Sequence, residues 1–284
     1  KAYQAEDEFF GPRNVMRQKN GLRIALDRPW SVEKEGMPFC VRANRPVTPQ
    51  MMAEILSSHY EGTRDCCAHF GPGLSPHDAS SIRYICTGTT LESDLFILRD
   101  DPKLTTVMSS FGRPCQLPYV ALHPLLAQPD ALDPMADASG RMESHLAPET
   151  GASCWRNTPW WRMRAFETQA ELLFSDVTGG LRALMERMLA QGLESDARLC
   201  EKLAVLLAEG DEAEARKTAE QADDSALHAA LHTLEDYARA NFAAVRLSLP
   251  MTLSVCPQEG ERVRAVFHTA RTPVENAMIL GVIH

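Results

Sequence analysis

Apolar residues at helical spacing place a short helix near residue 50. Thr48-Pro49 is typical of a helix start, with a capping threonine followed by a proline in the first turn. Four apolar side chains follow at helical spacing as far as Leu56, so we expect helix from Pro49 to about Tyr60, where Gly62 can end it. Residues 1–46, rich in proline, glycine and arginine, are expected to be irregular.

Short apolar runs after residue 80 predict an antiparallel meander. Alternation of apolar and polar residues over 82–87 predicts one strand, and the apolar run 95–98 predicts a second. Residues 105–109 are β-compatible, with Pro102 in the turn before them. Residues 124–157 carry several prolines and read as a long connection, which in a compact domain indicates a lid or a mobile segment.

A helical pattern dominates from Thr158-Pro159 to about Val245. We expect Gly179-Gly180 to interrupt it, and we expect further helices over about 195–208 and 211–245, separated by Gly210. Residues 262–267 are β-compatible again. The chain therefore divides into residues 1–157, with a helix and antiparallel strands, and residues 158–284, a helical region with a short terminal strand. The fold class is α+β.

Composition narrows the functional classes. The chain has 284 residues and a net charge of −9, which argues against general nucleic-acid binding. The sequence contains no run of 18 uninterrupted apolar residues, so it predicts no membrane-spanning helix. The eight cysteines are scattered and form no CxxC pair, so reduced thiols and a cytoplasmic location are the expectation.

Three segments, in this order along the chain, resemble the secernin/dipeptidase family of N-terminal-nucleophile (Ntn) hydrolases. They are His59-Tyr-Glu-Gly-Thr-Arg-Asp65, the stretch 81–99 with its Thr-Thr-Leu-Glu-Ser core, and residues 111–122 with Gly112-Arg-Pro-Cys115. The resemblance implies a four-layer αββα sandwich, of which residues 1–157 are the C-terminal part. The helical region 158–284 follows this part.

The family resemblance also implies a chemistry. An N-terminal cysteine attacks a peptide carbonyl, and its own α-amino group serves as the base. This chain begins with Lys1, so we expect the nucleophile in an upstream segment of the same protein. The implied reaction is dipeptidase-like hydrolysis of a short peptide or linear amide, without metal or organic cofactor, in a homo-oligomer. The alternative is a non-catalytic, secernin-like scaffold or binding subunit of the same fold.

Several residues are candidates for the site of such an enzyme. Related amidases place an arginine near the nucleophile, and Arg23 is the candidate here because a fixed cation lowers a thiol pKa. The alternative is an ordinary surface arginine. The matching motifs supply the candidate substrate-binding residues, which are His59, Glu61, Thr63, Asp65 and Arg113. For the first of these motifs we favour the simpler interpretation, in which Gly62 caps the helix and Asp65 forms a turn.

Two other chemistries are weaker alternatives. The crowded residues His59, Asp65, Cys66, Cys67 and His69 are potential zinc ligands, but they lack the usual spacing of a zinc knuckle, and we predict no metal. Cys115 with His123 is a candidate thiol–imidazole pair, against which stands the reading of Cys115 as a small buried apolar residue. No phosphate-binding loop, HExxH helix or G-x-S-x-G elbow is present.

Overall fold

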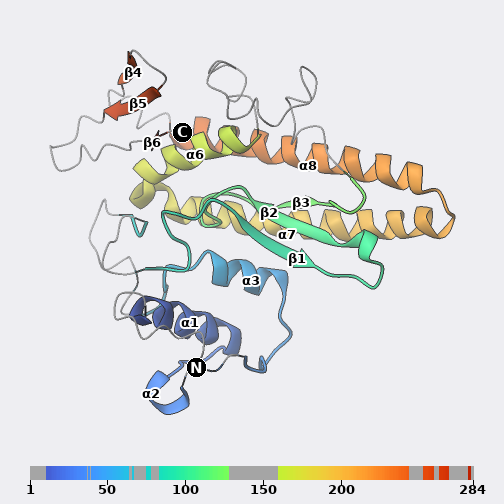
Figure 1. The fold of residues 1–284 in the computed structure, drawn as a ribbon, viewed down its shortest axis with the longest axis horizontal. Helices are drawn as coiled ribbons and strands as arrows, with labels where there is room; N and C mark the ends of the chain where they lie inside the picture. The colour runs from blue at the N-terminus through green and yellow to red at the C-terminus, as the bar shows by residue number, and fades with distance from the viewer. Residues whose placement is uncertain are drawn as a thin grey trace.

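The computed structural model describes residues 11–36, 38, 40–63, 66, 75–77, 83–127, 159–242, 252–258, 262–268 and 281–282. These residues form a mixture of helices and small antiparallel sheets, which confirms the α+β class (Figure 1). Asp65 and the predicted connection beyond residue 127 lie outside the described residues.

The central sheet is an antiparallel meander. Its strands β1 (Ser93–Ile97), β2 (Thr106–Ser110) and β3 (Val120–Leu122) are hydrogen-bonded in sequence order. Leu95 pairs with Met108, and both are buried on the same face. The short 3-10 helix η2 (Pro102–Leu104) occupies the predicted turn. A second sheet contains β4 (Thr252–Gln258), β5 (Arg262–His268) and β6 (Gly281–Val282), of which only β5 was predicted.

The predicted strand at 82–87 is wrong over its described residues. Residues 83–87 have no strand pairing, although Tyr84 and Cys86 are almost completely buried. Their alternation with half-buried neighbours arises because a loop passes through the interior, where it mimics the period of a half-exposed strand. Burial, and not sheet formation, produced the pattern.

The helical region was predicted in outline. It contains α6 (Pro159–Leu172), α7 (Phe174–Ala208) and α8 (Glu212–Asn241), and Gly210 lies between α7 and α8 as expected. The predicted break at Gly179-Gly180 is wrong, because α7 runs through both glycines and the predicted helix 195–208 is its final part. A Cβ atom at Gly180 would lie 2.9 Å from Tyr237 Oη, so close packing against α8 explains a glycine within this helix.

The N-terminal region is more regular than predicted. It contains α1 (Gly11–Leu26) and the one-turn helix α2 (Val32–Glu35), so the expectation of an irregular segment is wrong for these residues, while residues 40–46 are irregular as predicted. Proline is tolerated in a first helical turn, and Ile24 and Leu26 bury the inner face of α1. The predicted start of α3 (Pro49–Leu56) is confirmed, with Thr48 Oγ1 accepting a hydrogen bond of 3.2 Å from the backbone N–H of Met51. The predicted end is wrong, because the helix stops at Leu56 and Gly62 lies in the turn that follows.

Two apolar clusters hold the sheet between helices. Leu95, Met108 and Tyr119 pack against Ala53 of α3 and Leu189 of α7. The larger cluster joins β3 to α6, α7 and α8 through side chains that include Leu117, Val120, Leu122, Met163, Leu184 and Leu231. In Figure 1, α7 and α8 run side by side along the longest axis, with the sheet beside α7 and α3 close to β1. None of the described helices is long and apolar enough to cross a membrane.

Candidate metal centre

A strained turn after α3 positions the first histidine. Gly62 has φ of 75°, and Tyr60, which is not glycine, has φ of 62°. Such a conformation is unfavourable for a bulky residue and persists only where the surroundings enforce it. Tyr60 is held by the hydrogen bond of 2.6 Å that its hydroxyl donates to the carbonyl oxygen of Arg83, and by its burial. The turn thereby fixes the adjacent His59, which is 1% exposed.

Glu61 anchors the same turn. Its Oε2 accepts hydrogen bonds from Ser58 Oγ at 3.1 Å and from the backbone N–H of His59 at 2.9 Å. Its other oxygen, Oε1, pairs with Arg182 of α7. Burial acts to raise the pKa of Glu61, but the hydrogen bond with His59 and the charge of Arg182 outweigh burial and lower it strongly. The ionised form of Glu61 is therefore favoured, on the outer side of the His59 ring.

Two loops bring cysteines to this turn. The backbone N–H of Cys86 donates a hydrogen bond of 3.3 Å to the carbonyl oxygen of Ser58. Cys115 lies in the turn between β2 and β3, where a Cβ atom at Gly112 would lie 2.7 Å from Glu167 Oε1, so only glycine fits. Arg113 anchors that turn to α6 through Glu167, whose Oε1 accepts from Arg113 Nε at 3.0 Å.

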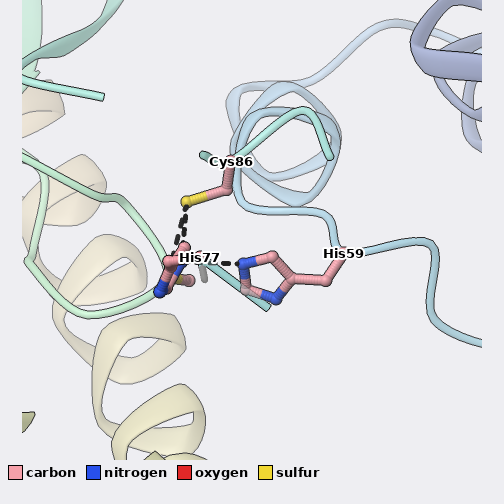
Figure 2. Close-up of side chains that lie close together, drawn as sticks. His59, His77 and Cys86 are labelled. Carbon is pink, nitrogen blue, oxygen red and sulfur yellow. Dashed lines mark hydrogen bonds between the residues drawn. The ribbon is translucent and has the colours of Figure 1, made fainter. Parts of the chain in front are cut away.

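Four side chains converge where these segments meet. His77 Nε2 lies 3.1 Å from His59 Nε2, 3.4 Å from Cys115 Sγ and 3.8 Å from Cys86 Sγ. The two sulfur atoms are 3.4 Å apart. Figure 2 shows the rings of His59 and His77 directed toward each other, with the Cys86 sulfur directed toward His77. One donor atom from each of the four residues lies within 4.8 Å of all the others.

This spacing matches a tetrahedral ion. Zinc binds sulfur at about 2.3 Å and imidazole nitrogen at about 2.0 Å, which separates two sulfur ligands by about 3.8 Å and two nitrogen ligands by about 3.3 Å. The observed separations of 3.4 Å between the sulfurs and 3.1 Å between the nitrogens are close to those values. One cation at the centre would contact all four donors. The four donor atoms therefore fit the geometry of a tetrahedral metal site.

A carboxylate lies on the outer side of each imidazole. His77 Nδ1 lies 2.7 Å from Glu171 Oε2, and His59 Nδ1 lies 3.4 Å from Glu61 Oε1. Glu171 also accepts a hydrogen bond of 2.7 Å from Gln116 Nε2, and Arg113 Nη1 lies 3.4 Å from it. A carboxylate on the outer nitrogen directs the inner nitrogen toward a metal and increases its basicity, as is usual in zinc sites.

The electrostatics of the cluster favour negative charge on the sulfur of Cys86 but not on that of Cys115. Burial acts to raise the pKa of Cys86, but contacts with Cys115, His59 and His77 lower it well below the ordinary thiol value. Burial and the neighbouring Cys86 raise the pKa of Cys115. At Glu171 burial opposes ionisation, yet the hydrogen bond with His77 and the charges of His77 and Arg113 lower the pKa to about 2. These shifts favour a thiolate at Cys86 and a protonated thiol at Cys115 in the metal-free cluster.

The structure distributes the residues predicted from sequence around this cluster. His59 is one of the four converging residues, Glu61 lies behind it, and Arg113 contacts Glu171. Arg23 lies on α1, where Nη2 donates a hydrogen bond of 3.0 Å to the carbonyl oxygen of Glu61. Thr63 donates to the carbonyl oxygen of Tyr60 at 2.7 Å, which is a turn contact. Asp65 lies outside the described residues, as do Cys67 and His69 of the rejected zinc cluster.

The sequence patterns did not reveal three residues of this cluster. His77, Cys86 and Glu171 were not singled out, because the first two lie in irregular segments and Glu171 is a helix residue 94 positions beyond His77. The proposed pairing of Cys115 with His123 is not what the structure shows, since His77 is the histidine beside Cys115. The sequence feature that could have indicated them is that His77 and Cys115 each follow a proline in a loop segment.

His123 belongs to a second buried cluster. Its Nδ1 lies 2.7 Å from Asp223 Oδ1, and its Nε2 lies 3.0 Å from Asp196 Oδ1. Asp196 Oδ2 accepts a hydrogen bond of 2.6 Å from Arg99, and Cys200 lies at the edge of the group. Burial acts to lower the pKa of His123, but hydrogen bonds to the two aspartates raise it to about 11. Two carboxylates and two cations balance here, so this cluster needs no metal.

Comparison with known proteins adds no assignment. No protein-family model matches the chain, and no curated protein matches it.

Proposed function

We propose that the chain binds one zinc ion through His59, His77, Cys86 and Cys115. The observation that carries this proposal is the convergence of two sulfur and two nitrogen atoms at the separations of a tetrahedral site. A set of two thiolates and two imidazoles in tetrahedral geometry suits zinc better than magnesium or calcium, which prefer oxygen. Three of the four side chains, those of His59, His77 and Cys86, are at most 1% exposed.

The role of this ion is structural. Four protein ligands complete a tetrahedron, whereas catalytic zinc sites keep one position open for water or substrate. His59 lies in the turn after α3, and His77 lies in the segment 75–77. Cys86 comes from the loop before β1, and Cys115 comes from the β2–β3 turn. Zinc would link these segments to one another. Through His77, which Glu171 contacts, it would also link them to α6.

The test is metal analysis of the purified chain. We expect one zinc ion per chain by mass spectrometry of the metal content. We also expect cobalt substitution to give the thiolate-to-cobalt absorption bands of a tetrahedral site. Cys86→Ser should lose both signals. Cys200→Ser is the matched control, because it removes a buried cysteine from the second cluster. A chain that folds but takes up neither metal would refute the proposal.

As a second candidate, we propose the dipeptidase-like amide hydrolysis that the family resemblance implies. One observation supports it: the first and the last of the three resembling segments supply His59 and Cys115 to one cluster, although they are far apart in sequence. In this proposal the attacking cysteine lies upstream of Lys1, the substrate is a short peptide, the protein is a homo-oligomer and zinc stabilises the scaffold. The finer αββα architecture belongs to the same proposal, and the largely exposed Phe96 offers an apolar surface to a second sheet.

A dipeptide-hydrolysis assay of the complete gene product, with and without thiol alkylation, tests this second proposal. Hydrolysis that alkylation abolishes would support it. Hydrolysis unaffected by alkylation would refute the thiol mechanism, and absence of hydrolysis from a folded protein would favour the scaffold alternative.

A further inference from the structure

The four ligands differ in their access to the outside. Cys86 is 0% exposed and His59 is 1% exposed, and the side chain of His77 is also 1% exposed. Cys115, in contrast, is only partly buried. Of the four residues, Cys115 is therefore the one that lies nearest the protein surface.

Cys115 lines a pocket of about 260 Å³ between α3, α7 and the β2–β3 turn. Ala53 contributes to its wall from α3, and Arg182 and Glu186 contribute from α7. The volume accommodates a small molecule of a few heavy atoms, such as a hydroperoxide. We call this space the Cys115 pocket, and it brings the surface close to one residue of the cluster.

The charges around the Cys115 pocket select against anions. Glu54 and Glu186 line it with two carboxylates. The one arginine in the lining, Arg182, is already paired with Glu61. Negative charges near an entrance lower the local concentration of anionic reagents, while neutral molecules are unaffected.

On the basis of the proposed zinc site, we propose that Cys115 is a modification site at which small neutral hydroperoxides open the metal centre. In the zinc-loaded protein the metal would hold Cys115 as a thiolate. This sulfur attacks one oxygen of hydrogen peroxide, the O–O bond breaks, hydroxide leaves (an organic hydroperoxide would release its alkoxide), and Cys115 becomes a sulfenic acid. The Cys86 thiolate then attacks the Cys115 sulfur and expels a second hydroxide as the S–S bond forms. Two thiolates lose two electrons, peroxide gains them, and two protons from solvent convert both hydroxides to water.

The geometry permits the second step. The two sulfur atoms are 3.4 Å apart, so they approach by about 1.4 Å to reach the length of a disulfide bond. Neither thiolate is then available to zinc, and a site with two remaining imidazoles releases the ion. Oxidation would thereby detach the four ligand segments from one another.

The test begins with zinc-loaded protein, which separates the two proposals. Hydrogen peroxide should release zinc to a chromogenic chelator and form a Cys86–Cys115 disulfide, detected by peptide mapping. With iodoacetamide, Cys115 should react before Cys86, while exposed Cys40 and buried Cys200 serve as internal references for a fast and a slow thiol. Protein that never binds zinc refutes the zinc proposal. Protein that holds zinc while Cys86 reacts as early as Cys115 refutes only the present one.

Matched charge variants test the route. The double variant Glu54→Gln/Glu186→Gln should raise the rate at which iodoacetate alkylates Cys115 by about threefold, with little change for iodoacetamide. The rate at Cys40 should stay the same in both proteins. An unchanged iodoacetate rate at Cys115 would show that reagents do not enter through the Cys115 pocket and would overturn the proposal.

Discussion

The two buried histidine clusters contain similar residue types but arrange them differently. In the first, His59, His77, Cys86 and Cys115 direct soft donor atoms at one another. In the second, each nitrogen of His123 faces an aspartate oxygen, and Arg99 balances the remaining charge. The second cluster is complete as an ion network, whereas the first is, in our proposal, completed by a cation in its centre.

The difference shows that residue types alone do not define a metal site. Cys200, Asp196 and His123 are metal ligands in many proteins, and their donor atoms also lie close together. What separates the clusters is where the carboxylates lie. In the first they lie behind the imidazoles and direct them inward, and in the second they lie on both sides of the imidazole and neutralise it.

Removal of a metal ligand should have the largest effect. We expect Cys86→Ala to weaken zinc binding by more than about 100-fold, beyond the effect of an outer carboxylate. In the wild type, a strong chelator should lower the midpoint of thermal unfolding, because the binding energy of a structural ion stabilises the fold. Titration calorimetry measures the zinc affinity, and scanning calorimetry with and without chelator measures the midpoint of thermal unfolding. The same chelator response in Cys86→Ala as in the wild type would contradict the comparison.

Loss of His123 should destabilise the chain without affecting zinc. His123→Gln leaves two buried aspartates without their imidazolium partner, and we expect the free energy of unfolding to fall by about 3–5 kcal/mol. Denaturant unfolding measures the loss, and metal analysis should still find zinc. His232→Gln, at an exposed histidine of α8, is the matched control.

The pH dependence of this stabilisation has a definite sign. The pKa of His123 is raised from 6.5 to about 11 in the folded chain. Its contribution is therefore complete below pH 6.5 and declines as the pH rises toward 11. The difference in unfolding free energy between wild type and His123→Gln should shrink over that interval, and a difference that grows with pH would contradict the assignment.

The outer carboxylate of the metal centre should have an intermediate effect. Glu171→Gln keeps the shape of the side chain but weakens its hold on His77, and we expect zinc affinity to fall by about 10–100-fold. Competition with a chelator of known affinity measures this change. Glu194→Gln, at an exposed glutamate of α7, should leave the affinity unchanged. Equal effects of the two substitutions would remove the argument for an oriented imidazole.

The smallest expected effect is that of Arg23. Arg23→Ala removes one hydrogen bond to the carbonyl oxygen of Glu61, so we expect a loss of about 1 kcal/mol in unfolding free energy and unchanged zinc content. Denaturant unfolding and metal analysis measure these two quantities. If the variant lost zinc as completely as Cys86→Ala, Arg23 would have a direct role at the centre.

Local patterns predicted the parts of the fold that depend on neighbouring residues. The start of α3 at Thr48-Pro49, the strands β1 and β2 and the separation of α7 from α8 at Gly210 follow from capping, alternation and glycine. The predictions failed where tertiary packing overrides such rules. Tyr237 packs against Gly180 and the helix continues, and the interior position of Tyr84 and Cys86 imitates a strand.

The amino-acid order by itself therefore determined the α+β class, most helix positions and the supply of cysteines and histidines. Only the tertiary structure decided that His77 and Glu171 join His59 and the two cysteines, and that His123 does not. The reason is physical: metal ligation depends on the positions of donor atoms in space, and loops far apart in sequence have no periodic pattern that reveals where they meet. The packing of α3, α6 and the β2–β3 turn supplies those positions.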